Sequence, residues 1–200
     1  MPHEHYYTPN PTSDVIEKKM TFEIGDTHLD LLSVSGVFGF SNYVDKASKM
    51  LIHAFSPTGP KVLDLGCGFG AIGLSIKAVH SELDVVLSDI NSRAVAYASK
   101  NAEHNNLEVS VVLSDLFEEF SGKCFNDIVT NPAIASGKAF LNKLIDSSFE
   151  HLEPGGALWL VAFHNKGGST LKNLMRVRFG NAVDIEKGGG IRVYKSIKPE

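Results

Sequence analysis

A glycine-rich segment is the part of the sequence best suited to bind a small ligand. Residues 64–73 have the sequence Asp-Leu-Gly-Cys-Gly-Phe-Gly-Ala-Ile-Gly. Glycine lets the backbone turn sharply and approach a ligand closely, and open α/β sheets bind ligands where their strands end. Gly66, Gly68 and Ala71 fit the dinucleotide fingerprint G-x-G-x-x-A. Alone, the segment is compatible with a nicotinamide dinucleotide or with S-adenosylmethionine. It is also compatible with a tight turn that binds nothing.

Three acidic residues at the ends of successive strands distinguish between S-adenosylmethionine and a nicotinamide dinucleotide. Asp89 is placed to accept hydrogen bonds from both ribose hydroxyls, and Asp115 to accept from an adenine amino group, with Leu116 against the ring. Asp64 precedes the glycines, where a dehydrogenase needs no acid but where the amino-acid end of S-adenosylmethionine would lie. Each acid could instead cap a helix. Because all three occur in order, the pattern predicts S-adenosylmethionine and not a nicotinamide dinucleotide.

Asn131 and Pro132 directly follow the fourth strand of this series and are the candidate catalytic residues. The Asn side-chain oxygen and the backbone carbonyl on the Pro side can both accept hydrogen bonds from a planar amino group. Such bonds would aim the lone pair of the amine at a sulfonium methyl group, so transfer is a direct displacement that depends on positioning. No metal and no covalent intermediate are required. Without the glycine segment, Asn-Pro would only indicate a turn.

Apolar strands alternate with helical segments throughout the region that holds these motifs. The expected strands are residues 61–65, 85–89, 109–113, 127–130 and 157–163, and the expected helices are residues 71–79, 91–105, 137–152 and 169–179. Strands that are apolar throughout are typical of a parallel sheet covered on both faces. Residues 182–187 and 191–197 are separated by three glycines, a link that permits only an antiparallel hairpin. The pattern predicts an α/β fold with a mostly parallel seven-stranded sheet, helices on both faces and an antiparallel C-terminal hairpin.

The sequence before this region predicts a smaller extension. Residues 21–34 alternate around a Gly-Asp turn and predict a hairpin, and residues 44–55 have helical spacing. The first twenty residues show no period and are expected to be flexible or loosely packed. We therefore expect an N-terminal extension over residues 1–56, packed on a core of residues 57–200.

Length and composition are those of an ordinary globular domain. The chain has 200 residues, of which 43% are apolar and 21% charged. No apolar run approaches the ~18 residues that span a membrane, and the N-terminus does not resemble a signal peptide. Cys67 and Cys124 are too few for a disulfide framework or a zinc cluster. A cytoplasmic setting with reduced thiols is the expectation.

The sequence resembles the RsmC-like family of small-subunit ribosomal RNA guanine-N2 methyltransferases, especially its short single-domain archaeal members. The resemblance covers nearly the whole chain. Its segments are residues 35–38 (Ser-Gly-Val-Phe), 44–46 (Val-Asp-Lys), 64–73, 131–132, 137–138, 179–181 and 192–196. It implies a Rossmann-like class I methyltransferase fold, S-adenosylmethionine as cofactor, an RNA substrate and a cofactor-side role for Phe38. The cofactor-binding residues expected from the motifs and the resemblance are Phe38, Asp64, Gly66, Cys67, Gly68, Asp89, Ile90, Asp115, Leu116 and Asn131.

The chain departs from the family pattern just after the candidate catalytic pair. The family usually has Asn-Pro-Pro, an aromatic residue or Ile, and then His or Arg, whereas residues 131–136 are Asn-Pro-Ala-Ile-Ala-Ser. Ala133 lacks the rigidity of a second proline. Ile134 offers no aromatic face for stacking on a base, and Ala135 has no polar head. Phe163 could supply a stacking face, although a role in the core is the stronger expectation.

Charge is distributed unevenly, which bears on the RNA partner. Up to Leu160 there are 11 Lys and Arg against 20 Asp and Glu, and beyond it 8 against 3. The excess is either ordinary surface variation or a basic face for an anionic partner. The candidate RNA contacts are Lys166, Lys172, Arg176, Arg178, Arg192 and Lys195.

Two other functions compete with RNA methylation. A protein methyltransferase acting on a glutamine amide would share the Asn-Pro chemistry, but that family favours Asn-Pro-Pro-Tyr and has a helical N-terminal domain. A catalytically weakened protein that binds S-adenosylmethionine or RNA is the second alternative, motivated by Ala133 and Ala135.

Overall fold

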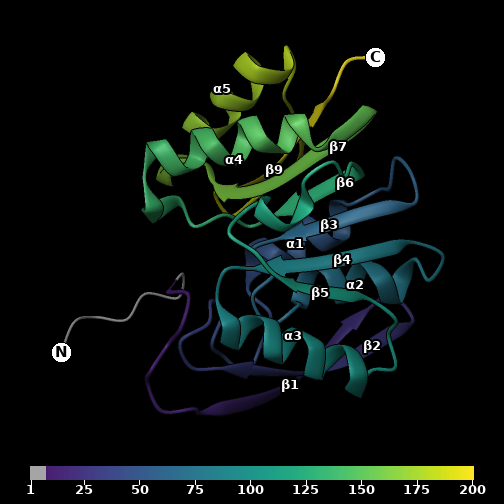
Figure 1. Ribbon diagram of the computed structural model, residues 1–200, viewed down its shortest axis with the longest axis vertical. Helices are drawn as coiled ribbons and strands as arrows, with labels where there is room; N and C mark the ends of the chain where they lie inside the picture. Colours follow the sequence, from purple (N-terminus) through teal and green to yellow (C-terminus); the bar gives the residue numbers. More distant parts are fainter. Residues whose placement is uncertain (1–7) are drawn as a thin grey trace.

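The computed structural model describes residues 8–200 and contains one seven-stranded mixed sheet and one two-stranded hairpin (Figure 1). The sheet has the order β5-β4-β3-β6-β7-β9-β8. Its strands are β3 (Lys61–Leu65), β4 (Asp84–Asp89), β5 (Ser110–Leu113), β6 (Phe125–Thr130), β7 (Leu152–Phe163), β8 (Val183–Gly188) and β9 (Ile191–Ile197). Neighbouring strands from β5 to β7 run parallel, while β9 is antiparallel to both β7 and β8. The predicted fold class is confirmed, including its C-terminal antiparallel hairpin.

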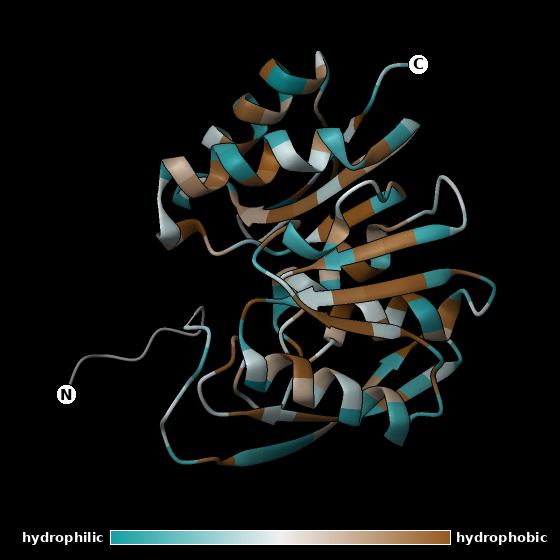
Figure 2. Ribbon diagram, viewed as in Figure 1, coloured by the Kyte–Doolittle hydropathy of each residue, from teal (hydrophilic) through white to brown (hydrophobic). Residues whose placement is uncertain are grey.

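Helices cover both faces of this sheet. They are α1 (Lys46–Ala54), α2 (Ala71–Val79), α3 (Ser92–His104), α4 (Lys138–Glu150) and α5 (Gly168–Phe179). Successive strand residues point to opposite faces, so Val62 belongs to the buried cluster that contains residues of α1, α2 and α3, whereas Leu63 belongs to the cluster that contains residues of α4 and α5. The apolar colouring of the central strands in Figure 2 reflects this burial on both sides. Single-turn 3-10 helices, which the sequence did not indicate, follow β5, β6 and β7 as η1 (Glu118–Phe120), η2 (Ile134–Ser136) and η3 (His164–Lys166).

The N-terminal hairpin consists of β1 (Glu17–Ile24) and β2 (Thr27–Val34) and packs beside α3 (Figure 1). Buried Asn101 of α3 makes this contact specific. Its side chain accepts from the Leu32 amide and donates to the Leu32 carbonyl, at 2.8 and 3.0 Å. The same amide group donates to the Phe69 carbonyl at 2.8 Å. One side chain therefore joins the hairpin to the glycine-rich segment.

The lead-in before the hairpin is more ordered than the sequence suggested. Strand β1 already begins at Glu17, and the Arg93 guanidinium donates to the carbonyls of Pro11, Ser13 and Ser35. The sequence of the lead-in has no period that would indicate this order, because the order comes from Arg93, which is distant in the sequence. The first seven residues of the expected flexible segment lie outside the described residues.

A buried carboxylate fixes the turn between β3 and α2. Asp64 is fully buried, and its Oδ2 accepts from the Gly73 amide at 2.7 Å. A Cβ atom on Gly73 would lie 2.9 Å from Leu87 Cγ and 3.0 Å from Asp64 Cβ, so only glycine allows α2 to approach the sheet this closely. Burial, together with the nearby Asp89 charge, raises the pKa of Asp64 to about 7, against the lowering effect of the Gly73 hydrogen bond.

This raised pKa predicts a specific pH dependence of stability. Because the folded state holds the Asp64 proton up to about pH 7 while the unfolded chain releases it near pH 3.8, the group's contribution to stability is lost as pH rises through that window. Asn at this position cannot ionise. Between pH 5 and pH 8 the free energy of unfolding of the parent should therefore fall relative to Asp64→Asn, by up to a few kcal/mol.

Urea denaturation of both proteins at several pH values measures this difference, and the other titrating groups cancel because both proteins share them. Parallel stability profiles from pH 5 to pH 8 would show that Asp64 ionises normally in the folded protein.

Candidate functional site

A cavity of about 280 Å³ opens at the carboxyl ends of β3, β4, β5 and β6. A second, smaller cavity of about 30 Å³ adjoins it at the glycine-rich segment and shares Phe38, Gly66 and Asn131 with it. The residues from the sequence prediction that line either cavity are Phe38, Gly66, Cys67, Gly68, Asp89, Ile90, Asp115, Leu116, Asn131 and Pro132. The fold thus gathers these residues, from widely separated parts of the chain, around one continuous space.

Asp89 ends β4 and lies at the wall of the larger cavity. Its Oδ2 accepts from the Gly68 amide at 2.8 Å and its Oδ1 from the Asn91 amide at 2.9 Å. These bonds fix the plane of the carboxylate and leave further lone pairs on each oxygen for a ligand. Burial raises the pKa of Asp89, and the backbone hydrogen bonds oppose this by stabilising the charged form.

The glycine-rich segment follows β3 and turns over the end of β4. The amides of Gly66 and Cys67 both donate to the Ser88 carbonyl, at 2.8 and 2.9 Å. Gly66 and Gly68 have φ values of 75° and 57°, conformations that L side chains rarely adopt. Burial, together with nearby carboxylates, raises the pKa of Cys67 well above its usual range, so its thiol stays protonated and is not a nucleophile.

The residues after β5 form another part of the larger cavity wall. Asp115 and Leu116 line it, and the Leu116 backbone has a φ of 51°. A leucine in this left-handed conformation costs of the order of 1 kcal/mol. The Ser114 hydroxyl donates to the Leu116 carbonyl at 3.0 Å and helps to hold this conformation, which presents Leu116 at the cavity.

Asn131 and Pro132 extend from β6 into the same space. The Pro132 carbonyl accepts from the Ile134 amide at 2.9 Å across Ala133, whose φ and ψ are −69° and 80°. These angles are those of an inverse γ-turn, and the φ is one that proline also adopts. The chain therefore keeps a proline-like backbone at Ala133 without a second proline. A second lone pair on the Pro132 carbonyl is available to a ligand.

A hydrogen bond from Asn91 holds the segment that contains Phe38. The Asn91 Nδ2 donates to the Gly36 carbonyl at 2.9 Å, while its Oδ1 caps α3. Val37 and Phe38 consequently line the larger cavity, and Phe38 is 41% exposed. An apolar wall of this kind suits the flat ring system of a nucleoside.

Asp64 is the exception among the predicted cofactor-binding residues. It does not line either cavity, because it lies beneath the glycine-rich segment with its Oδ2 bonded to Gly73. Its Oδ1 is buried and has no hydrogen-bond partner among the described residues. Asp64 therefore supports the turn from below, and its expected contact with the cofactor stays a prediction.

Several lining residues were not singled out from the sequence. Phe140 and Leu144 of α4 reach the larger cavity, and their spacing of four residues was the only signal, one that a core-facing helix shares. Asp45 and Ser48 at the start of α1 line the smaller cavity. Only the fold brings α1 to this place, so no local pattern could have found them. The remaining unpredicted lining residues are Val37, Leu65, Phe69, Ala71, Ile72, Ser114, Thr130, Ala133 and Ser136.

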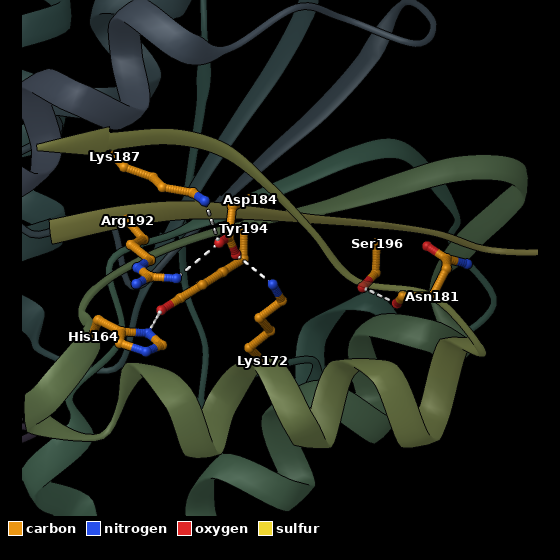
Figure 3. A network of polar contacts seen from close by, with 8 residues as sticks. All are labelled: His164, Lys172, Asn181, Asp184, Lys187, Arg192, Tyr194 and Ser196. Atoms are coloured by element: carbon orange, nitrogen blue, oxygen red, sulfur yellow. Dashed lines mark hydrogen bonds and ion pairs between the residues drawn. The ribbon is translucent and has the colours of Figure 1, made fainter.

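The predicted basic face is largely engaged within the protein. Lys172, Lys187 and Arg192 all surround Asp184, with nitrogen–oxygen distances of 2.6, 3.2 and 2.8 Å (Figure 3). Burial tends to raise the pKa of Asp184, but its bonds to these cations outweigh that effect and lower it to about 2.

Two further basic residues expected to contact RNA are also engaged. Arg178 pairs with Asp146 and Glu150, and the Lys195 ammonium lies 4.2 Å from the Trp159 ring centroid. The net charge of residues 161–200 gave no indication of these internal pairs. Four of the six candidate RNA contacts are therefore engaged by acidic or aromatic side chains of the protein, and Lys166 and Arg176 are exposed. Which of the six contact RNA stays a prediction.

The described residues contain neither a metal-binding cluster nor a membrane-spanning helix. Within residues 8–200, no three His, Cys, Asp or Glu side chains form a group that could hold a metal ion. No helix in that part of the chain combines the length and apolar character needed to cross a membrane.

Comparison with known proteins shows the family to which this chain belongs. Residues 28–195 match the methyltransferase small domain family. The chain belongs to this family. It is 32% identical over 98% of both chains to the uncharacterized protein YbxB of Bacillus subtilis (strain 168). It is 34% identical to the ribosomal RNA small subunit methyltransferase C of Pasteurella multocida (strain Pm70), over 86% of this chain and 52% of that protein. The chain spans about half the length of the methyltransferase C relatives that it matches.

Solved structures agree with the fold of a methyltransferase small domain. The T. thermophilus 16S rRNA N2 methyltransferase RsmC, in complex with AdoMet and guanosine, superposes with a TM-score of 0.79 at 24% identity, covering 94% of this chain and 52% of that one. A methyltransferase from Pyrococcus furiosus gives a TM-score of 0.66 at 20% identity, over 80% and 85% of the two chains. Family and fold make this chain an S-adenosylmethionine-dependent methyltransferase.

The cavity has the chemistry that this cofactor needs. The Asp89 carboxylate suits the ribose hydroxyls, and Asp115 beside Leu116 suits the adenine edge and face. The smaller cavity, next to the glycine-rich segment, suits the amino-acid end. The buried, unpartnered Asp64 Oδ1 beneath this segment carries negative charge when ionised and would favour a cationic group nearby. We therefore expect Asp115 and Leu116 to hold the adenine, Asp89 the ribose, and the glycine-rich segment the amino-acid end of the cofactor.

Removing the Asp89 carboxylate should weaken the binding of S-adenosylmethionine. Asp89→Ala loses a charged acceptor that also anchors the Gly68 amide, so the loss should reach a few kcal/mol of binding free energy. The matched control is Asp84→Ala, which removes an exposed acid from the opposite end of the same strand. Calorimetric titration of both variants measures the difference. Equal affinities in parent and Asp89→Ala would place the ribose elsewhere.

Proposed function

We propose that this methyltransferase modifies the exocyclic N2 amino group of a guanine in small-subunit ribosomal RNA. The observation that carries the proposal is the position of Asn131, which lines both the larger cavity and the smaller one at the glycine-rich segment. An acceptor at this junction can face an amine on one side and the cofactor on the other. The relatives named ribosomal RNA small subunit methyltransferase C support RNA as substrate.

The chemistry required of the protein is mainly orientation. S-adenosylmethionine, when bound, supplies a methyl group on a positively charged sulfur, an electrophile that needs no further activation. The Asn131 Oδ1 and the Pro132 carbonyl accept the two protons of the guanine amino group. They thereby direct the nitrogen lone pair, which forms the new bond to carbon as the carbon–sulfur bond pair returns to sulfur. The surplus amine proton then passes to solvent.

An exposed aromatic side chain near the catalytic segment fits an RNA base. Phe163, at the end of β7, was expected in the core but is 43% exposed, and the Lys166 ammonium lies 5.5 Å from its ring centroid. The loop that follows is close to the catalytic segment, since a Cβ on Gly167 would lie 2.6 Å from Ile134 Cγ2. An aromatic ring beside a cation provides a stacking face for a nucleotide of single-stranded RNA. The target guanine itself must leave its stack to reach Asn131.

Replacing Asn131 separates the chemical step from cofactor binding. Asn131→Ala should abolish methyl transfer to unmethylated small-subunit ribosomal RNA, because the amine is no longer oriented, while the affinity for S-adenosylmethionine changes much less. Asn173→Ala, an exposed asparagine on α5, is the control.

Transfer of labelled methyl groups followed by nucleoside analysis gives both the rate and the product. Label in N2-methylguanosine from the parent, absent with Asn131→Ala, is the expected result. Label in another nucleoside, or near-normal turnover by Asn131→Ala, would contradict the proposal.

A further inference from the structure

A buried serine on α1 contacts the candidate catalytic asparagine. Ser48 is 4% exposed and lies on the buried face of the helix together with Ala47, Leu51 and Ile52. A hydroxyl group on such an apolar face requires a hydrogen-bond partner. The Asn131 Nδ2 donates to the Ser48 Oγ at 3.2 Å. A helix outside the parallel-sheet region thus supplies a contact to the end of β6.

The serine is held in place independently of Asn131. The Asp45 carboxylate caps α1 and accepts from the amides of Ala47 and Ser48, at 3.0 and 3.1 Å. Capping by Asp is among the strongest local determinants of where a helix begins. Asp45 and Ser48 also line the smaller cavity beside Asn131. The first turn of α1 is therefore a fixed wall of the site.

This contact anchors the Asn131 amide in one of its two orientations, with the Ser48 hydroxyl as the acceptor. Because a hydroxyl can also donate, the anchor keeps this orientation when the other end of the amide meets a donor, as it does with an amine. The side chain carries a donor nitrogen and an acceptor oxygen on one planar group, and rotation by 180° exchanges them. Only the orientation with the oxygen toward the substrate can accept a proton from an amine. With its nitrogen on Ser48, the amide has its oxygen as the atom left for the substrate.

We propose that Ser48 is a positioning residue that holds the Asn131 carboxamide with its oxygen toward the acceptor amine. The proposal rests on the function proposed above, because it assigns Ser48 a part in that same transfer. Ser48 acts through Asn131 and does not itself contact the reacting atoms. It follows that loss of the Ser48 hydroxyl should slow the chemical step by a larger factor than it weakens the binding of S-adenosylmethionine, although Ser48 also lines the smaller cavity.

The test compares Ser48→Ala with Ser75→Ala. Ser75 is also a buried helical serine, but its hydroxyl has no partner among the described residues and does not line either cavity. In single-turnover methylation of ribosomal RNA, Ser48→Ala should lower the rate on the order of 10- to 100-fold, as expected for misplacement of a reacting group. Its affinity for S-adenosylmethionine should fall by a much smaller factor than the rate. Ser75→Ala should leave both unchanged, and Ser48→Thr, which keeps the hydroxyl, should recover much of the rate.

A second measurement needs no substrate. The side-chain amide protons of Asn131, assigned in an ¹⁵N spectrum by their loss in Asn131→Ala, should exchange slowly in the parent and in Ser75→Ala but rapidly in Ser48→Ala. Unchanged exchange in Ser48→Ala overturns the proposal, as does a normal rate or an equal loss of cofactor affinity. If the parent methylates no guanine, the proposed function fails instead, and amide exchange still reports whether Ser48 holds Asn131.

Discussion

The hydrogen bond between the buried Asp64 carboxylate and the Gly73 amide is the constraint on which the site depends. It brings the first turn of α2 against β3 and β4, at a distance that leaves no room for a Cβ on Gly73. The chain between these two residues must then turn tightly, and its amides meet the ends of neighbouring strands. Gly68 reaches the Asp89 carboxylate in this way, so the position of the proposed ribose acceptor follows from the packing beneath it.

The N-terminal extension is built into the site through polar side chains. Asn101 connects β2 to the glycine-rich segment, Asn91 connects the Gly36 carbonyl to the end of β4, and Ser48 contacts Asn131. Each of these groups is buried or partly buried, where an unpaired polar atom would be costly. Strand ends supply the acidic residues of the cavity, and the extension supplies its outer wall. We infer that residues 8–56, the described part of the extension, act as one unit with residues 57–200, although the two parts are separable in the sequence pattern.

Local signals explain what the sequence could predict. Apolar strands, the helical segments between them and the three glycines before β9 determined the element order, and strand ends such as Asp89 and Asp115 indicated the cavity. Contacts between distant segments had no such signal. The burial of Asp64, the approach of Ser48 to Asn131 and the engagement of Lys172 by Asp184 depend on how elements pack. Charge counted along the chain therefore suggested a basic face that the fold largely neutralises.

The most direct test of this account is a crystal structure of the protein with S-adenosylhomocysteine and guanosine. The account predicts the ribose hydroxyls of the cofactor product on Asp89 and the adenine beside Asp115 and Leu116. It predicts the guanine N2 within hydrogen-bonding distance of the Asn131 Oδ1 and the Pro132 carbonyl. Guanosine bound away from Asn131, or an Asn131 amide with its nitrogen toward the guanine amino group, would contradict it.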